Sequence, residues 1–241
     1  MKALILNSGL GSRMGKLASK HPKCMTEIAP GETIISRQLR LLSKNNIDKI
    51  VITTGLFDNI LIAYCKSLEL PIDIEFIKNP LYRDTNYIYS IYCARDHLSD
   101  DILLMHGDLV FDEVVLQGII AAKRSVMAVS STLPLPQKDF KAVINNDHIV
   151  SIGIDFFNSA VEAQALYKLE RDTWNLWLEN IIAFCESDDS QKRKCYAEAA
   201  FNEISDKCLI YPYDCKDLLC SEIDDSNDLY IVSQKLSCLN N

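Results

Sequence analysis

The sequence predicts an α/β protein in which helices cover both faces of a largely parallel sheet. Two observations support this prediction. Apolar, β-branched runs of strand length alternate along the chain with longer segments whose apolar residues recur at helical spacing. Loops rich in glycine follow three of these runs, at Gly9, Gly55 and Gly107, where the strands of a parallel sheet end and ligands bind. Helical crossovers between such strands give a three-layer arrangement.

The first half of the chain carries the most regular alternation. Residues 2–6 (KALIL) form an apolar run that we predict as a buried strand, and residues 33–46 place Ile35, Leu39 and Leu42 at helical spacing. Residues 49–55 (KIVITTG) repeat the strand pattern with β-branched side chains. By the same criteria we predict further strands at 72–77, 101–108 and 126–131, and further helices at 56–70, 86–98 and 113–123.

In the second half of the chain the predicted strands and helices no longer alternate regularly. Residues 140–157 (FKAVINNDHIVSIGIDFF) predict two strands joined by a polar turn at 145–147. Helices are predicted at about 159–185, at 192–204 and at 226–239, with a short strand at 208–214. The charged stretch 186–194 is interpreted as a solvated loop between helices. Because no low-complexity linker divides the 241 residues, we predict one domain.

Charge, hydropathy and cysteine usage exclude several classes of protein. The net charge of −8 argues against a polymeric nucleic acid partner, which requires a broad basic face. No apolar run reaches the length of a membrane span, and the first residues are too short for a signal peptide. Nine cysteines without a C-x-x-C pair argue against a disulfide framework. We therefore expect a cytoplasmic protein with no membrane partner.

Residues 6–25 (LNSGLGSRMGKLASKHPKCM) form a cationic loop after the first predicted strand. Neither familiar phosphate-binding motif fits it. The Walker pattern fails in its spacing, and Leu17 stands where the hydroxyl residue belongs; the dinucleotide pattern fails because Met14 replaces its third glycine. What remains is G-x-G-x-R, followed by Pro22-Lys23. Glycines allow backbone N–H groups to approach a phosphate, and arginine and lysine supply positive charge.

This loop resembles that of nucleotidyltransferases that join a nucleoside triphosphate to a small phosphorylated molecule, release pyrophosphate and use Mg²⁺. The resemblance implies a Rossmann-like three-layer α/β/α nucleotidyltransferase fold with a mixed, mostly parallel sheet. It places Gly9, Gly11 and Arg13 around the triphosphate and Lys23 at the reacting phosphates, with Arg13 and Lys23 as catalytic residues. Ser12, in the same loop, is also predicted to contact the nucleotide. It also implies that residues 1–135 bind the nucleotide, and that residues 136–241 bind the acceptor and end in a closing helix.

Later segments narrow the resemblance. Residues 85–98 (TNYIYSIYCARDHL) and 222–229 (EIDDSNDL) are similar to bacterial phosphocholine cytidylyltransferases. Residues 106–112 (HGDLVFD) and 134–142 (PLPQKDFKA) look closer to the branch that acts on 2-aminoethylphosphonate. We therefore expect transfer of CMP from CTP to a small phosphonate such as 2-aminoethylphosphonate. Phosphocholine and sugar-1-phosphate nucleotidyltransferases remain the alternative enzymes, and a nucleotide-binding regulatory module remains the alternative without catalysis.

Metal and nucleotide residues follow from position and resemblance together. Asp108 ends a buried predicted strand, and the family pattern gives a metal-binding aspartate at Asp224, with the adjacent Asp225 as the alternative ligand. Mg²⁺ takes one or two carboxylates together with phosphate oxygens. His106, beside Asp108, is expected to be structural. The residues predicted to contact the nucleotide, besides the glycine loop, are Leu6, Asn7, Ser8, Thr54, Gly55, Asn86 and Ser90.

The acceptor is expected to bear an amine. A quaternary ammonium favours aromatic rings, whereas a primary ammonium can donate hydrogen bonds to carboxylates. Asp139 and Lys141 are predicted on one side of a strand, with Lys141 meeting the phosphonate and a carboxylate meeting the amine. Tyr196 and Glu198 complete the predicted acceptor set. The identity of the acceptor, the number of metal ions and a possible homodimer stay open at this point.

Overall fold

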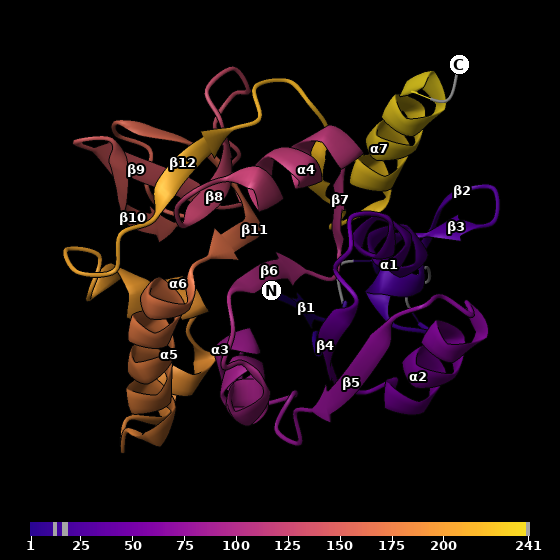
Figure 1. Ribbon diagram of the computed structural model, residues 1–241, viewed down its shortest axis with the longest axis horizontal. Helices are drawn as coiled ribbons and strands as arrows, with labels where there is room; N and C mark the ends of the chain where they lie inside the picture. The colour runs from indigo at the N-terminus through magenta and orange to yellow at the C-terminus, as the bar shows by residue number, and fades with distance from the viewer. Residues whose placement is uncertain (12–13, 16–18, 240–241) are drawn as a thin grey trace.

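The computed structural model describes residues 1–11, 14–15 and 19–239, and its core is one twisted sheet flanked by helices (Figure 1). In the described residues nine strands form this sheet, with the order β10-β9-β11-β6-β1-β4-β5, and β8 pairs with both β11 and β12. The strands are β1 (Lys2–Leu6), β4 (Lys49–Thr54), β5 (Asp73–Lys78), β6 (Ile102–His106), β8 (Val126–Ser130), β9 (Lys141–Asn145), β10 (His148–Gly153), β11 (Ala160–Leu169) and β12 (Tyr211–Asp214).

The half of the sheet formed by β6, β1, β4 and β5 is parallel, whereas β11 joins β6 in the antiparallel direction. Leu6 is in register with both Thr53 and His106. The ends of β1, β4 and β6 therefore lie side by side, and the loops that follow them meet at one edge of the sheet. This arrangement confirms the predicted mixed sheet and gathers the segments after Leu6, Thr54 and His106.

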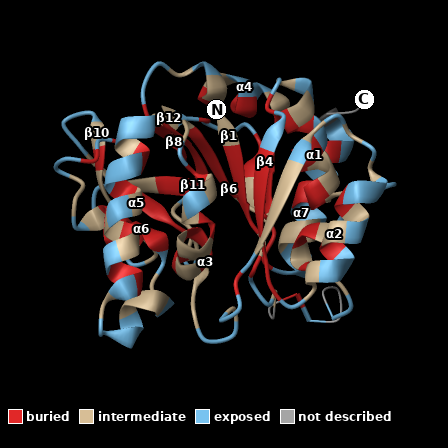
Figure 2. Cartoon of the chain, turned by 60° about the horizontal axis from the view of Figure 1, so that its bottom comes forward, coloured by how far each residue is buried: buried red, intermediate tan, exposed pale blue. Residues whose placement is uncertain are grey.

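Helices cover both faces of the sheet, as Figure 2 shows around the buried strands. The helices are α1 (Ile34–Lys44), α2 (Asp58–Ser67), α3 (Tyr87–Ala94), α4 (Glu113–Ala121), α5 (Arg171–Glu186), α6 (Ala197–Asn202) and α7 (Ser226–Leu239). Alternate residues of β1 point to opposite faces: Ala3 and Ile5 pack with α1, α2 and α4, whereas Leu4 and Leu6 pack with α3, α5 and α6. Both faces are buried, which explains the continuous apolar runs of the parallel strands.

The prediction of a helix at about 159–185 is wrong for its first part. Residues 160–169 form β11, and only residues 171–186 are helical, as α5. The segment AVEAQALYKL is rich in helix-forming residues. However, β11 pairs with β6, β8 and β9 in the centre of the sheet, and these distant partners override the local preference. The helix predicted at 192–204 is likewise shorter, because α6 starts at Ala197.

Four short strands escaped prediction, and two of them build the edge of the sheet where the loops meet. These strands are β2 (Glu27–Ala29), β3 (Glu32–Thr33), β7 (Leu109–Phe111) and β13 (Cys220–Glu222). Strand β13 pairs antiparallel with β7, so that Glu222 lies opposite Leu109. The backbone N–H of Ile223 donates to the carbonyl of Asp108 at 3.0 Å. This pairing carries residues 222–224 from the end of the chain to the end of β6.

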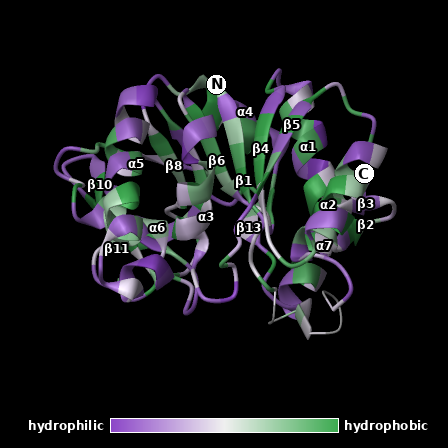
Figure 3. Ribbon diagram, turned by 90° about the horizontal axis from the view of Figure 1, so that it is seen from below, coloured by the Kyte–Doolittle hydropathy of each residue, from purple (hydrophilic) through white to green (hydrophobic). Residues whose placement is uncertain are grey.

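The C-terminal helix α7 packs beside this edge (Figure 1). Its residues Val232 and Leu236 are buried in a small apolar cluster with Met14, Ile34 and Val110. Figure 3 shows hydrophobic residues along the strands and hydrophilic residues on the outer helix surfaces. Among the described residues, none of the helices is both long and apolar enough to span a bilayer.

Candidate active site

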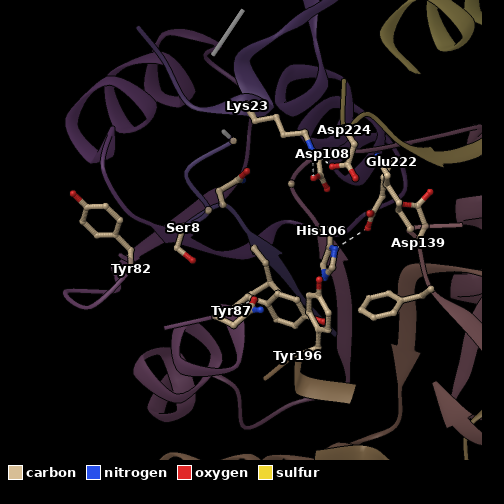
Figure 4. A pocket seen from close by; sticks show the side chains of 18 of the residues that line it. Ser8, Lys23, Tyr82, Tyr87, His106, Asp108, Asp139, Tyr196, Glu222 and Asp224 are labelled. Carbon is tan, nitrogen blue, oxygen red and sulfur yellow. Dashed lines mark hydrogen bonds and ion pairs between the residues drawn. The ribbon is translucent and has the colours of Figure 1, made fainter. Parts of the chain in front are cut away.

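A cavity of about 310 Å³ opens at the carboxyl ends of β1 and β6 (Figure 4). Six segments of the chain form most of its lining and are grouped here as four walls. The glycine loop after β1 forms the first wall, and the turn after β6 forms the second. The start of α3 and the segment around Tyr196 form the third wall, and the segment 138–140 and residues 222–224 form the fourth. The cavity therefore lies at the predicted ligand-binding edge of the sheet.

Lys23 bridges two carboxylates in this cavity. Its Nζ atom lies 2.6 Å from Oδ2 of Asp108 and 2.5 Å from Oδ1 of Asp224, and dashed lines mark these contacts in Figure 4. Burial lowers the pKa of Lys23, but Asp108 and Asp224 outweigh it and raise the pKa. Burial raises the pKa of Asp108, but Lys23 and then His106 outweigh it and lower the pKa. Lys23 and Asp108 are therefore both ionised at neutral pH.

A second ion pair joins His106 to Glu222. The Nδ1 atom of His106 lies 2.7 Å from Oε1 of Glu222, and both side chains line the cavity. Burial lowers the pKa of His106, but the carboxylates of Glu222, Asp108 and Glu198 together outweigh it and raise the pKa to about 9. His106 was expected to be structural and Glu222 was not singled out. Glu222 lies two residues before Asp224 in the sequence, but it reaches the cavity through the pairing of β13 (Cys220–Glu222) with β7.

The carboxylates fit a divalent cation. The Oδ1 atom of Asp108 is buried without a hydrogen-bond partner among the residues that the structure describes. Ligand atoms of His106, Asp108 and Glu222 lie within 4.8 Å of one another, and so do those of Asp139, Glu222 and Asp224. Hard oxygen donors of this kind are those that Mg²⁺ prefers. Asp224 lines the cavity.

The alternative ligand, Asp225, has a different place. It is exposed, and its Oδ1 atom accepts hydrogen bonds from the backbone N–H groups of Asn227 (2.8 Å) and Asp228 (3.1 Å). These contacts stabilise the first turn of α7, where the N–H groups have no partner within the helix. The geometry therefore favours Asp224 over Asp225 as the residue that faces a metal ion.

The residues predicted to contact the nucleotide fall into three groups. Ser12 and Arg13 lie outside the described residues. The residues that line the cavity are Leu6, Asn7, Ser8, Gly9, Gly11 and Asn86. The side chain of Asn86 also caps α3, because it accepts a hydrogen bond from the backbone N–H of Tyr87 at 2.8 Å.

The third group lies behind the cavity wall. The Oγ atom of Ser90 lies 2.5 Å from that of Ser8, so Ser90 supports the glycine loop from below. The hydroxyl of Thr54 donates to Asp58 at 2.5 Å. A Cβ atom on Gly55 would come 2.5 Å from the Ser8 carbonyl oxygen, so a close approach of two backbone segments requires glycine there. None of these three residues is part of the cavity lining.

The acceptor residues are separated in the same way. Asp139 and Tyr196 line the cavity. Lys141 is fully buried, and its Nζ atom donates to the carbonyl oxygens of Pro136 (2.5 Å) and Asp139 (3.0 Å). The expectation that Asp139 and Lys141 share one side of a strand is wrong, because β9 begins only at Lys141. The ammonium of Lys141 instead fixes the loop that carries Asp139.

Glu198, the remaining predicted acceptor residue, is buried and binds two tyrosine side chains. It accepts hydrogen bonds from the hydroxyls of Tyr167, at 2.7 Å, and Tyr87. Tyr87 stands in the cavity wall with its ring centroid 4.7 Å from that of His106 and 5.7 Å from that of Tyr196. The ring of Phe140 lies 5.2 Å from Tyr196. The third and fourth walls together thus present three aromatic rings and the carboxylates of Asp139 and Glu222.

The chain is similar in sequence to several known proteins. Residues 3–138 match the MobA-like NTP transferase domain. The chain is 31% identical over 135 residues to a CMP-5'-(3-aminopropyl)phosphonate synthase of Streptomyces rubellomurinus, covering 56% of this chain and 21% of that protein. It is 27% identical to a CTP:phosphoglutamine cytidylyltransferase of Campylobacter jejuni, covering 78% of this chain and 79% of that protein.

Two further matches extend over almost the whole chain. A choline-phosphate cytidylyltransferase of Haemophilus influenzae is 25% identical, with 98% of each chain covered. The solved structure of the CTP:phosphocholine cytidylyltransferase from Streptococcus pneumoniae superposes with a TM-score of 0.74 at 18% identity, again with 98% of each chain covered. The structural likeness shows a shared nucleotidyltransferase fold. The chain spans only about a fifth of the length of the Streptomyces synthase.

Proposed function

The chain belongs to the family of MobA-like NTP transferase domains, and we propose that it is a CTP-dependent cytidylyltransferase. In this proposal it transfers CMP to a small amine-bearing phosphonate or phosphate, such as 2-aminoethylphosphonate, and releases pyrophosphate. One observation carries the proposal. A lysine and two aspartates converge in the cavity next to the glycine loop, and a wall that suits an ammonium group closes the other end.

The chemistry needs little beyond alignment and charge. An anionic oxygen of the acceptor phosphonate attacks the α-phosphorus of CTP, and the bond from that phosphorus to the bridging oxygen of pyrophosphate breaks. Because the attacking oxygen is already ionised, the reaction requires no general base. Catalysis then depends on holding both anions in line and stabilising the charge that develops.

Lys23 and the carboxylates supply this stabilisation in the proposal. The ammonium of Lys23 would contact the reacting phosphates, and the backbone of Gly9 and Gly11 would cradle the triphosphate. Asp108 and Asp224 would hold a divalent cation such as Mg²⁺, which supplies positive charge to the triphosphate when bound. Arg13 keeps its predicted catalytic role, which follows from the sequence alone. Residues 1–135 then form the nucleotide-binding part of a single domain.

The amine end of the acceptor would lie between the third and fourth walls. Asp139 and Glu222 can accept hydrogen bonds from a primary ammonium, and the rings of Tyr87, Phe140 and Tyr196 can face its positive charge. The Streptomyces, Campylobacter and Haemophilus relatives are named for nitrogen-bearing acceptors, which supports an amine here. The two carboxylates favour a primary ammonium. The three rings favour phosphocholine as the second candidate.

The test is a pyrophosphate-release assay with each of four nucleoside triphosphates and a panel of acceptors. We expect turnover with CTP and 2-aminoethylphosphonate, weaker turnover with phosphocholine, and none with sugar 1-phosphates. Lys23→Ala should lower kcat by about 10²–10³, the usual loss for one electrostatic contact in a transition state. Lys44→Ala is the matched control, because Lys44 also pairs with a carboxylate, at 2.7 Å from Glu113, on the surface. Turnover with UTP or dTTP and a sugar 1-phosphate, but not with CTP, would reject the proposal.

A further inference from the structure

We propose that Lys23 is an internal counter-ion that occupies the cation site of the nucleotide-free protein, so that a divalent cation enters together with the nucleotide and not before it. This inference rests on the proposed nucleotidyl transfer, because a triphosphate must draw Lys23 away. It concerns the order in which the cavity fills, which neither the fold nor the likeness to relatives specifies.

The contacts of Lys23 show the competition directly. Its ammonium bridges Oδ2 of Asp108 and Oδ1 of Asp224 at 2.6 and 2.5 Å. A Mg²⁺ ion bound to carboxylate oxygens approaches to about 2.0–2.1 Å. An ion that bridged the same two oxygens would therefore overlap the ammonium nitrogen. Lys23 and a bridging cation exclude each other at these carboxylates.

The charge of the cavity explains why the exchange needs two events. Four carboxylates, those of Asp108, Asp139, Glu222 and Asp224, lie in the cluster, and the ammonium of Lys23 bridges two of them. Departure of Lys23 alone would remove one positive charge from these carboxylates. A divalent cation that replaces Lys23 would instead add one positive charge. Departure of the ammonium is favourable only when the cation takes its place.

The same argument explains why the cation does not displace Lys23 unaided. Once displaced, the ammonium lies in a largely buried position, with 13% of its side chain exposed, and a buried charge without a partner is costly. The phosphates of a nucleotide give it new partners. Lys23 lines the same cavity as Gly9 and Gly11, so rotation about its side-chain bonds can carry the ammonium from the carboxylates toward the loop. Nucleotide and cation therefore bind with positive coupling.

A buried oxygen of Asp108 that has no hydrogen-bond partner among the described residues also supports binding of a cation at this site. Its Oδ1 atom is buried and has no hydrogen-bond partner among the described residues, although Oδ2 is occupied by Lys23. The lysine thus satisfies one oxygen of this carboxylate and leaves the other for a further ligand. The ammonium of Lys23 therefore blocks the position between the two carboxylates, but it does not satisfy every oxygen that a metal ion could bind.

Binding of Mn²⁺, measured by the electron paramagnetic resonance of the free ion, tests the proposal without turnover or acceptor. The wild-type protein should bind Mn²⁺ weakly alone and at least about tenfold more tightly with CTP, after subtraction of the Mn²⁺·CTP signal obtained with Asp108→Asn. Lys23→Gln without nucleotide should bind Mn²⁺ about tenfold more tightly than wild type, which corresponds to about 1.4 kcal/mol. Lys138→Gln is the matched control, since Lys138 lines the same cavity but is exposed, and no ion pair joins it to the cavity carboxylates within the part of the chain that the structure describes; it should change Mn²⁺ affinity far less.

The outcomes separate this inference from the proposed function. Equal Mn²⁺ affinity in Lys23→Gln and wild type would overturn the counter-ion role, and so would wild-type protein that binds Mn²⁺ as tightly without CTP as with it. If Lys23→Gln binds Mn²⁺ more tightly than wild type, but UTP and not CTP strengthens Mn²⁺ binding to the wild-type protein, the counter-ion role of Lys23 stands and the proposed cytidylyltransferase activity is rejected. Thermal unfolding checks that the variant is folded; if it is not, the wild-type comparison with and without CTP decides.

Discussion

Substituting Gly107 by alanine should damage the site through a neighbour that is remote in sequence. A Cβ atom at this position would overlap the side-chain amide of Asn7. Even the most distant of the three affected atoms, Nδ2, would lie at 2.8 Å, about 0.6 Å inside the 3.4 Å at which ordinary contact begins. Overpacking of this kind costs about 1–3 kcal/mol of unfolding free energy. Because Asp108 follows directly, a shift of about 1 Å could cost about 10²-fold in kcat/KM.

A double-mutant cycle tests this reasoning. Asn7→Ala removes the amide that the new methyl group would meet, so Asn7→Ala/Gly107→Ala should recover stability relative to Gly107→Ala, with a coupling energy of about 0.5–3 kcal/mol. Urea unfolding measures the change in unfolding free energy, and pyrophosphate release measures the change in kcat/KM. Gly9→Ala is the control for stability, since a Cβ atom there would meet nothing within 4 Å. Additive effects of the two substitutions would refute the steric explanation.

Three further predictions concern charge and burial. Asp108→Asn should lose about 10²–10³ in kcat while keeping a cooperative thermal transition; near-normal turnover would remove Asp108 from the site. Burial lowers the pKa of His106, and Glu222, followed by Asp108 and Glu198, raises it to about 9, so these carboxylates should stabilise the fold below about pH 6.5 and lose this contribution as the pH rises through 9. Urea unfolding from pH 6 to 10 should show this loss in wild type and a smaller loss in Glu222→Gln. Burial raises the pKa of Cys208 to about 12, so iodoacetamide should modify the exposed Cys238 in the native protein and Cys208 only after unfolding, as mass spectrometry can measure.

The sequence predicts the parallel half of the fold well because its signals are local. Strands such as β1 and β4 are continuous apolar runs, and their crossovers have helical periodicity. Strand β11 is different, because its residues favour a helix and its position depends on distant partners: Glu162 pairs with Ser130, 32 residues earlier, and Leu169 with Ile102, 67 residues earlier. Such pairings cannot be recognised from composition or periodicity. The same limit hides β7 and β13, each three residues long.

The residues of the candidate site also differ in whether local sequence patterns can identify them. Lys23 and Asp108 follow motifs and strand ends, so their convergence could be anticipated from the sequence. Glu222 could be found only from the pairing of β13 with β7. The predicted position of Lys141 is wrong because the strand does not extend back to Asp139. The chain turns there, and the buried ammonium of Lys141 donates a hydrogen bond to the carbonyl oxygen of Asp139. Local patterns identify which residues bear chemistry, and long-range pairing decides which of them meet.

The place of β11 has a consequence for how the protein is synthesised. Strands β5, β4, β1 and β6 are all complete once residue 106 has left the ribosome, but the strand that covers the free side of β6 ends only at Leu169. During the intervening synthesis, the nascent chain presents an apolar strand edge with unsatisfied backbone groups, the kind of surface that recruits other chains. Slow translation between these two points should therefore increase aggregation of the newborn protein, whereas pauses after residue 169 should be harmless.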